Sequence, residues 1–482
     1  MSRDLFRDPV WQAADVGRPI PDSVHAVSVA LPRWQDVVGY EEKNPAVMAQ
    51  ITSGYPRFVI HPLVQELARK IGGWPFPSAQ VAEMAAEFVR RSGAPATVNP
   101  QHAVVTDAAG ALALKMFWQH TGLIVSSRQA EALLAGRKAV ITPEVFRSLR
   151  QQLADFYDCN EGDVFLQPTG MAAQFAALRA LIARSPGRPT AQLGFPYVDT
   201  LKLQQKFGHG ATLLHNITTI EADLHELIHR QSLAGCFGEI PGNPLLGSAD
   251  LRQITPLLRS HGVPLVADDV VATPFNVDLS PYADLVATSL TKYVVGTGDV
   301  MGGALICNPR SPFYRELHAI VQTQHEELLW TEDAIVLDHQ AHGFPNRMQQ
   351  HNANGLFIAE HLRQHPAIEK VWYPKWEFAA AYDAVRRPTG GYGSLITFLP
   401  RNAEMTSPQI YDRMEFCKGP SLGTVFTLAC PFTLLAHYTE LDWAEACGVS
   451  RNLIRISVGL EDPAELWRKL DAALRNPASQ PH

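Results

Sequence analysis

Residues 264–308 read PLVADDVVATPFNVDLSPYADLVATSLTKYVVGTGDVMGGALICN, and Lys292 is the only Lys or Arg between Arg259 and Arg310. Its neighbours are Leu, Tyr, Val and Gly, so we expect its ammonium group to be desolvated. A desolvated lysine loses its proton easily and becomes a nucleophilic amine. The stretch therefore predicts amine chemistry at Lys292.

Two apolar runs in this stretch predict buried parallel strands that end in polar groups. PLVAD ends in Asp268, and ADLVATS leads to Ser289, Thr291 and Lys292. Ligands of open α/β sheets bind at this edge. Pyridoxal phosphate needs such a set: an amine for its aldehyde, a carboxylate for its ring nitrogen, and hydroxyl or N–H groups for its phosphate. Taken alone, Lys292 also fits an ordinary half-buried lysine at a strand end.

The bulk composition favours an enzyme that acts on small metabolites. The chain has 482 residues, 46% hydrophobic, and a net charge of −7 without a dense run of Lys or Arg, which argues against nucleic-acid or anionic-membrane partners. The six cysteines form no CxxC pair, as expected for buried thiols in a reducing compartment. We therefore expect a cytoplasmic protein, with no signal peptide and no membrane span.

The distribution of patterns predicts three parts. Residues 1–65 are rich in Pro and isolated aromatics, which suggests an arm on the surface of its own chain or of a neighbour. Residues 66–310 hold repeated strand–helix units, which imply right-handed crossovers and a mostly parallel sheet. Residues 311–482 predict a smaller α+β C-terminal domain. The expected fold class is thus α/β.

Phosphate-binding groups are predicted at two places. Tyr55 and Arg57, two residues apart in an extended Pro-containing segment, project to the same side and are able to grip a phosphate. A strand-to-helix turn at Gly170 and Met171 offers N–H groups at a helix start. Each also has an ordinary explanation, as a surface Tyr and Arg and as a plain turn.

Further polar groups follow other predicted strands. Tyr197 and Asn243 fall at strand ends near Lys292. Arg455 interrupts the apolar run LIRISVG, and a buried guanidinium requires an anion, either a substrate carboxylate or an internal Asp or Glu. Ser421 lies in a loop that is able to face the same cleft.

Two motifs resemble other kinds of site. His225-Glu226-Leu227-Ile228-His229 matches the HExxH pattern of zinc proteases, but its apolar residues predict that both histidines face solvent from a crossover helix, so we expect no metal. Gly296-Thr297-Gly298 lacks the third Gly of a dinucleotide-binding loop.

Several motifs, in order, resemble the Cys/Met-metabolism family of pyridoxal-phosphate enzymes. The resemblance runs from about residue 45 to the end, except for about 75–145, which looks like an insertion relative to the shorter bacterial members. Within the family, GYPRF, FPYVDT and KGPSLGT look most like fungal-type cystathionine γ-synthases. The motifs are Asp268 with Ala-Thr-Pro at 272–274, SLTKY at 289–293, GDVMGG at 298–303, Gly170-Met171, Glu239-x-x-x-Asn243-Pro, SLG at 421–423 and RISVGLED at 455–462.

The resemblance implies a fold-type I pyridoxal-phosphate transferase, working as a homodimer or homotetramer with shared active sites. Lys292 would carry the Schiff base, and Tyr197 and Tyr55 would join it as catalytic residues. Tyr55 and Arg57 would reach the phosphate of the adjacent subunit. The remaining implied contacts are Asp268 with the pyridinium nitrogen, Tyr197 stacked on the ring, Asn243 on the ring hydroxyl, Ser289, Thr291, Gly170 and Met171 on the phosphate, and Arg455 on the substrate carboxylate with Ser421 nearby.

The leading expectation is γ-replacement on an O-acylhomoserine by cysteine, the transsulfuration step toward methionine. A γ-lyase or hydrolase of a γ-heteroatom-substituted amino acid is the alternative, and a catalytically idle cofactor binder is a third possibility. Asp199 stands where many relatives have Gly or Cys. We expect Asp199 and Glu415 to line the distal half of the cleft and orient the ammonium of an incoming cysteine, unless they face solvent or pair with Lys202 and Lys418.

Overall fold

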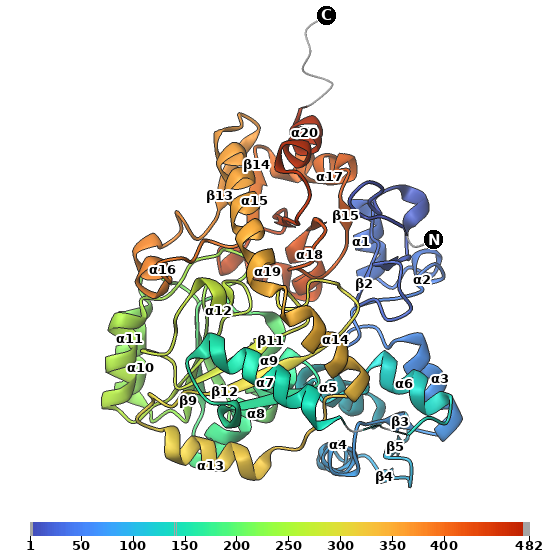
Figure 1. Ribbon diagram of the computed structural model, residues 1–482, viewed down its shortest axis with the longest axis vertical. Coiled ribbons are helices and arrows are strands. Elements are labelled where there is room, and N and C mark those ends of the chain that lie inside the picture. Colours follow the sequence, from blue (N-terminus) through green and yellow to red (C-terminus); the bar gives the residue numbers. More distant parts are fainter. Residues whose placement is uncertain (1–2, 139, 141, 476–482) are drawn as a thin grey trace, which may run out of the picture.

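A computed structural model describes residues 3–138, 140 and 142–475. Figure 1 shows a large sheet domain, a second sheet beyond it that carries the C-terminal helices, and the N-terminal arm beside the second sheet. A small sheet with helices α3 to α6 lies on the flank of the large domain. The large domain, the C-terminal domain and the N-terminal arm all contribute residues to one pocket.

The large domain is built on a seven-stranded sheet in the order β6-β12-β11-β10-β9-β7-β8. Neighbouring strands are parallel except that β12 runs antiparallel to both β11 and β6. This confirms the predicted mostly parallel sheet. The strands are β6 Val164–Gln167, β7 Thr190–Leu193, β8 Ala211–Leu214, β9 Gly235–Glu239, β10 Leu265–Asp268, β11 Leu285–Ser289 and β12 Gly303–Cys307.

Helices cover both faces of this sheet. Along β10, Leu265 and Ala267 belong to one buried apolar cluster while Val266 belongs to another on the opposite face. A strand buried on both faces needs the continuous apolar run seen in the sequence. The covering helices are α7 Pro143–Tyr157, α8 Gly170–Arg184, α9 Val198–Phe207, α10 Ile220–Arg230, α11 Leu251–Ser260, α12 Thr273–Asn276, α13 Tyr314–Gln324 and α14 Thr331–Ala341.

The C-terminal part forms a five-stranded sheet in the order β13-β14-β17-β16-β15. Its strands are β13 Ile368–Trp372, β14 Leu395–Pro400, β15 Cys417–Lys418, β16 Leu428–Cys430 and β17 Ile454–Ser457. Its helices are α15 Phe344–Gln364, α16 Ala379–Val385, α17 Ala403–Arg413, α18 Phe432–His437, α19 Leu441–Ala446 and α20 Pro463–Leu474. Strands and helices together give the α+β character expected from the sequence.

The N-terminal arm packs against this C-terminal sheet of its own chain. Its elements are β1 Pro19–Ile20, β2 Ser28–Val29, α1 Trp34–Glu41 and α2 Pro45–Met48. Leu31 is buried in the same cluster as Phe398 and Tyr411, and the Tyr411 hydroxyl donates to the Leu31 carbonyl at 2.7 Å. The arm is therefore part of the folded chain, with short helices that its weak periodicity did not predict.

Residues 62–134 form a unit on the flank of the large domain. Its elements are α3 Pro62–Ile71, β3 Trp74–Pro75, α4 Ala79–Arg91, β4 Ala96–Val98, β5 Ala103–Thr106, α5 Ala111–Thr121 and α6 Ser127–Leu134. The strands pair antiparallel in the order β3-β5-β4. Most of this unit falls within the segment 75–145 that the sequence marks as an insertion.

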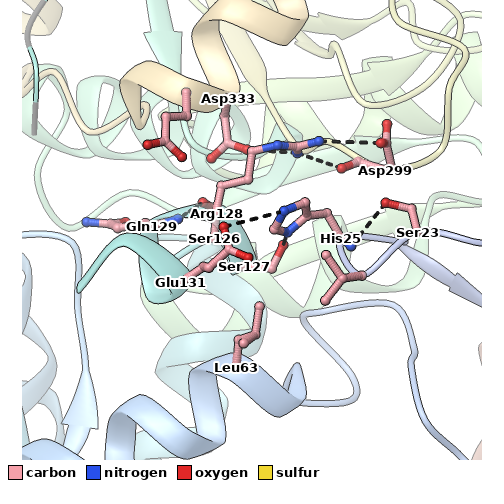
Figure 2. Close-up of polar contacts among 12 residues, drawn as sticks. Ser23, His25, Leu63, Ser126, Ser127, Arg128, Gln129, Glu131, Asp299 and Asp333 are labelled. Atoms are coloured by element: carbon pink, nitrogen blue, oxygen red, sulfur yellow. Dashed lines mark hydrogen bonds and ion pairs between the residues drawn. The ribbon is translucent and has the colours of Figure 1, made fainter. Parts of the chain in front are cut away.

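A buried arginine ties this unit to the loop that follows Lys292. Arg128, near the start of α6, donates from Nη1 to the Asp299 carbonyl at 2.7 Å and to Asp333 Oδ1 at 3.2 Å (Figure 2). His25 of the arm meets the Ser127 hydroxyl at 3.0 Å in the same cluster. The arm, the inserted unit and the large domain are thus held together at one point.

Candidate active site

A cavity of about 160 Å³ opens at the carboxyl edge of the parallel strands. Glu239, Asp268 and Ser289 line it from the ends of β9, β10 and β11. Ligands of open α/β sheets bind at this edge. Residues of the arm and of the C-terminal domain close the other side, namely Tyr55, Arg57, Phe58, Pro420, Ser421, Leu422, Cys430, Phe432, Leu435, Ala436 and Arg455.

Lys292 is the central amine of this cavity. Only 9% of the residue is exposed, and Nζ donates to Ser421 Oγ at 2.8 Å and lies 4.5 Å from the ring centre of Tyr55. Burial lowers the pKa of Lys292, while the Tyr55 hydroxyl opposes that shift. Ser421 adopts φ 105°, a left-handed conformation that costs energy and is typical of functional sites. The predicted desolvated amine is therefore present.

Asp268 is a half-buried carboxylate that lacks a cation among the described residues. Its partners are Gln174 Nε2 at 2.8 Å and the Val270 N–H at 2.9 Å. Burial raises the pKa of Asp268 to about 7. The amide oxygen of Gln174 is also buried without a hydrogen-bond partner. A protonated ring nitrogen next to Asp268 would supply the missing positive charge, so these residues fit a pyridinium group.

The start of α8 lies against β11 beside Lys292. A Cβ atom at Gly170 would lie 2.6 Å from the Cβ of Ser289, so only glycine allows this approach. Gly170, Met171 and Ser289 line the cavity, as predicted for a phosphate site. Thr291 does not line it, because its buried hydroxyl bonds the Gly302 backbone N–H at 3.1 Å. The role of Thr291 as a phosphate ligand stays a prediction.

Tyr55 and Arg57 line the cavity of their own chain. That they reach the phosphate of an adjacent subunit stays a prediction, since the structure describes one chain. Arg57 donates to the Tyr197 hydroxyl and to Asp199. The Lys292 ammonium and the Arg57 guanidinium outweigh burial and lower the pKa of the Tyr55 hydroxyl. Tyr55 is thus poised to exchange a proton with Lys292.

Arg455 marks the place for a carboxylate. It is 5% exposed, stacks on the Phe432 ring at 4.9 Å, and donates to Asn243 Oδ1 at 3.1 Å and the Ser421 carbonyl at 2.8 Å. None of its hydrogen bonds among the described residues goes to a carboxylate. An internal acidic partner was one possibility for a buried guanidinium, and its absence from this set leaves Arg455 free for a substrate carboxylate.

The predicted positions of Asp199 and Glu415 are both wrong. Asp199 is fully buried behind Tyr197, where it pairs with Arg57 and lies 3.1 Å from His120 Nδ1. Glu415 is exposed to solvent on the C-terminal domain and does not line the cavity. Neither acid pairs with the lysines considered, because Lys202 pairs with Glu440 and Lys418 donates to backbone carbonyls.

The sequence did not predict Gln174 or His120 as site residues, and it named Glu239 only as part of a motif, without a role. Glu239 accepts from the backbone N–H groups of Tyr197 and Asn243 and so holds both strand-end loops in place. Gln174 lies one helical turn after Gly170, a spacing that places it above Asp268. His120 comes from the inserted unit, where nothing in the sequence connects it with the strand ends.

The HExxH motif at 225–229 lies on a helix with both histidines facing solvent, as predicted. Leu224, Leu227 and Ile228 are buried, while His225 and His229 are exposed on α10. Within residues 3–138, 140 and 142–475, no group of three or more His, Cys, Asp or Glu is arranged to hold a metal ion. No helix of the same residues is long and apolar enough to cross a bilayer.

Comparison with known proteins decides the family. Residues 125–475 match the family model of the Cys/Met metabolism PLP-dependent enzymes. The chain belongs to this family. Its cofactor is therefore pyridoxal phosphate, and the resemblance drawn from the motifs is confirmed.

The relatives are named for different reactions. A cystathionine γ-synthase of Neurospora crassa is 33% identical, over 96% of this chain and 98% of that protein. An L-2-amino-4-chloropent-4-enoate dechlorinase/desaturase of Streptantibioticus cattleyicolor is 32% identical, over 94% of this chain and 97% of that protein. A crystal structure of cystathionine γ-synthase from Xanthomonas oryzae pv. oryzae in complex with cystathionine matches with a TM-score of 0.61 and 25% identity, over 69% of this chain and 86% of that chain. The fold is thus fold-type I.

Proposed function

We propose that this enzyme catalyses γ-replacement on an O-acylhomoserine, joining it to cysteine as a cystathionine γ-synthase does. The observation that carries the proposal is Arg455, a buried guanidinium whose hydrogen bonds go to Asn243 and Ser421 and not to a carboxylate, in the cavity that holds the Lys292 amine. An α-amino acid offers a carboxylate that this guanidinium is able to bind. The synthases among the relatives support the same reaction.

The residues that would hold pyridoxal phosphate are Lys292, Asp268, Tyr197, Asn243, Ser289, Arg57, Tyr55 and the N–H groups at Gly170 and Met171. When bound, the cofactor withdraws electrons from Cα of the substrate. Asp268 supports this by favouring a protonated ring nitrogen. Arg455 orients the substrate through its carboxylate, and Tyr197 covers one face of the cavity.

Proton transfer falls to Lys292 and Tyr55. Lys292 Nζ is free to move protons between carbon atoms because burial lowers its pKa and its partners Ser421 and Tyr55 are hydroxyl groups. Tyr55 lies within reach of Nζ, and its lowered pKa suits exchange with an amine. Removal of protons from Cα and Cβ then allows the γ-substituent to leave.

The test is a steady-state assay of the purified holoenzyme with acyl-homoserines, with and without cysteine. We expect cystathionine to form in the presence of cysteine, with little keto acid released. Rapid keto-acid release that cysteine does not change would contradict the synthase proposal.

A γ-lyase is the second candidate, and one observation favours it. Neither acidic side chain predicted to orient an incoming cysteine lines the cavity. A lyase needs no second amino acid, and the dechlorinase/desaturase among the relatives is named for the removal of a substituent. The same assay separates the two reactions.

We further propose that the enzyme works in the cytoplasm as a homodimer or homotetramer. The six cysteines are free thiols, four of them buried, which suits a reducing compartment.

Light scattering coupled to gel filtration tests the assembly, and a monomer at working concentration would contradict it.

A further inference from the structure

Four side chains from three segments form one buried network beside the cavity. Asp199 of α9 pairs with Arg57 of the arm. It also accepts from Gln119 Nε2 at 3.2 Å and lies 3.1 Å from His120 Nδ1. Gln119 and His120 are on α5 of the inserted unit, and Arg57 Nη1 donates to the Gln119 carbonyl at 2.9 Å. The inserted unit therefore contacts a cavity residue directly.

The positive charge of Arg57 is paired with the negative charge of Asp199. Burial opposes ionisation of Asp199, but the Arg57 guanidinium and His120 outweigh it and lower the pKa of Asp199 to about 2. A buried pair is stable only when its remaining polar atoms are satisfied, and α5 supplies those bonds. Two nitrogens of Arg57 are held by Asp199, Gln119 and Tyr197, so the guanidinium has one orientation.

The same helix reaches the start of α8. Thr169, the residue that caps α8, donates from its hydroxyl to the carbonyl of Gly122, which ends α5, at 2.9 Å. A Cβ atom at Gly122 would lie 2.2 Å from that hydroxyl, so the contact requires glycine, whose φ here is +66°. The inserted unit is also fixed to the loop after Lys292 by Arg128 (Figure 2).

We propose that His120 and Gln119 are positioning residues for the cofactor, acting through Asp199 to hold Arg57 where its free N–H groups meet the phosphate. This assigns the inserted unit the task of fixing the phosphate end of the site. The inference rests on the pyridoxal-phosphate chemistry proposed above, but it does not depend on which γ-substituent leaves.

The first experiment titrates the apoprotein with pyridoxal phosphate and follows the visible absorption of the bound cofactor. We expect His120→Ala to raise the dissociation constant about 3–30-fold, and excess cofactor to reverse the accompanying loss of turnover. His120→Asn, whose amide is able to donate to Asp199, should restore most of the affinity. No change in affinity for His120→Ala would overturn the proposal.

Two variants of α5 separate positioning from general packing. Lys115 is exposed on the same helix, and Lys115→Ala should bind the cofactor as wild type does. Phe117 is buried on α5 outside the network, and Phe117→Leu should lower the melting temperature of the apoprotein without loosening the cofactor. Equal loss of affinity in Phe117→Leu and His120→Ala would contradict positioning.

A double-mutant cycle gives the sharpest test. If His120 acts through Arg57, the variant Arg57→Met with His120→Ala should bind no more weakly than Arg57→Met alone. Multiplying losses would show that His120 acts independently and would overturn the proposal. These titrations need no substrate. A failure to turn over acyl-homoserines would therefore contradict the proposed reaction without changing the effect of His120 on cofactor affinity.

Discussion

The cofactor end and the substrate end of the cavity are built differently. The cofactor end holds charged or titratable groups, each fixed by at least one hydrogen bond or ion pair. These groups are Lys292, Asp268, Glu239 and Arg57. At the substrate end, the lining side chains of the C-terminal domain and Phe58 of the arm are mainly apolar, and Arg455 supplies a positive charge. These apolar residues are Phe58, Leu422, Phe432, Leu435 and Ala436.

The difference shows what each end selects. Charged groups at the cofactor end meet the fixed charges of pyridoxal phosphate, whereas an apolar wall favours substituents without charge. The cofactor end thus sets the reaction class, and the substrate end sets the choice of γ-substituent.

The largest effect is expected from Lys292→Ala, which removes the one lysine among the described residues that line the cavity. Turnover should fall by about a thousandfold or more, since no neighbouring group replaces a nucleophilic amine. Lys206, exposed on α9, offers the matched control, and Lys206→Ala should keep normal rates. Full activity of Lys292→Ala would show that another residue carries the chemistry.

The next effect concerns Arg57→Ala. A charge-assisted phosphate contact contributes about 1.5–3 kcal/mol, so the affinity for pyridoxal phosphate should fall about 10–150-fold, as measured by titration of the apoprotein.

Mixing variants tests whether the site belongs to one chain. Arg57 and Lys292 line the same cavity of one chain, so mixing refolded Arg57→Ala and Lys292→Ala proteins should restore no activity. Restored turnover in the mixture would show that the arm completes the site of a neighbouring subunit.

At the substrate end we expect discrimination by charge. An O-acetyl ester carries no charge beyond the homoserine unit, whereas an O-succinyl ester carries a carboxylate that the apolar wall cannot pair. The ratio of kcat/KM for the two esters should favour acetyl by about tenfold or more. A preference for the succinyl ester would mean that a second cation, besides Arg455, pairs with the succinyl carboxylate.

A smaller effect on stability tests Asp268 at the cofactor end. Burial raises the pKa of Asp268 to about 7 in the folded apoprotein, above its unfolded value, so the stabilising neutral form is lost as pH rises from about 4 to about 7. The apoprotein of Asp268→Asn should therefore melt a few degrees higher than wild type at pH 8 and show no such advantage at pH 4. Bound pyridoxal phosphate should remove that advantage.

The sequence was informative where residues follow strands. Asp268, Ser289 and Lys292 end buried apolar runs, and parallel strands bring such ends together. Thr291 lies only two residues after Ser289, but the chain turns there and directs its hydroxyl to Gly302, which strand alternation does not predict. Asp199 and His120 meet through tertiary packing of the inserted unit, for which no sequence spacing gives a signal.

The smallest expected effect is that of Glu415→Gln. Glu415 is exposed and outside the cavity, and a surface carboxylate of this kind contributes little to binding. The KM for cysteine and the KM for the acyl-homoserine should both stay within about twofold of wild type. Asp199→Asn offers the contrast, because Asp199 pairs with Arg57. This variant should lower the affinity for pyridoxal phosphate. At saturating cofactor, the ratio of the two KM values should stay unchanged. A selective rise in the KM for cysteine in either variant would mean that an acidic side chain does reach the incoming amino acid, and the substrate end would then be polar in the working enzyme.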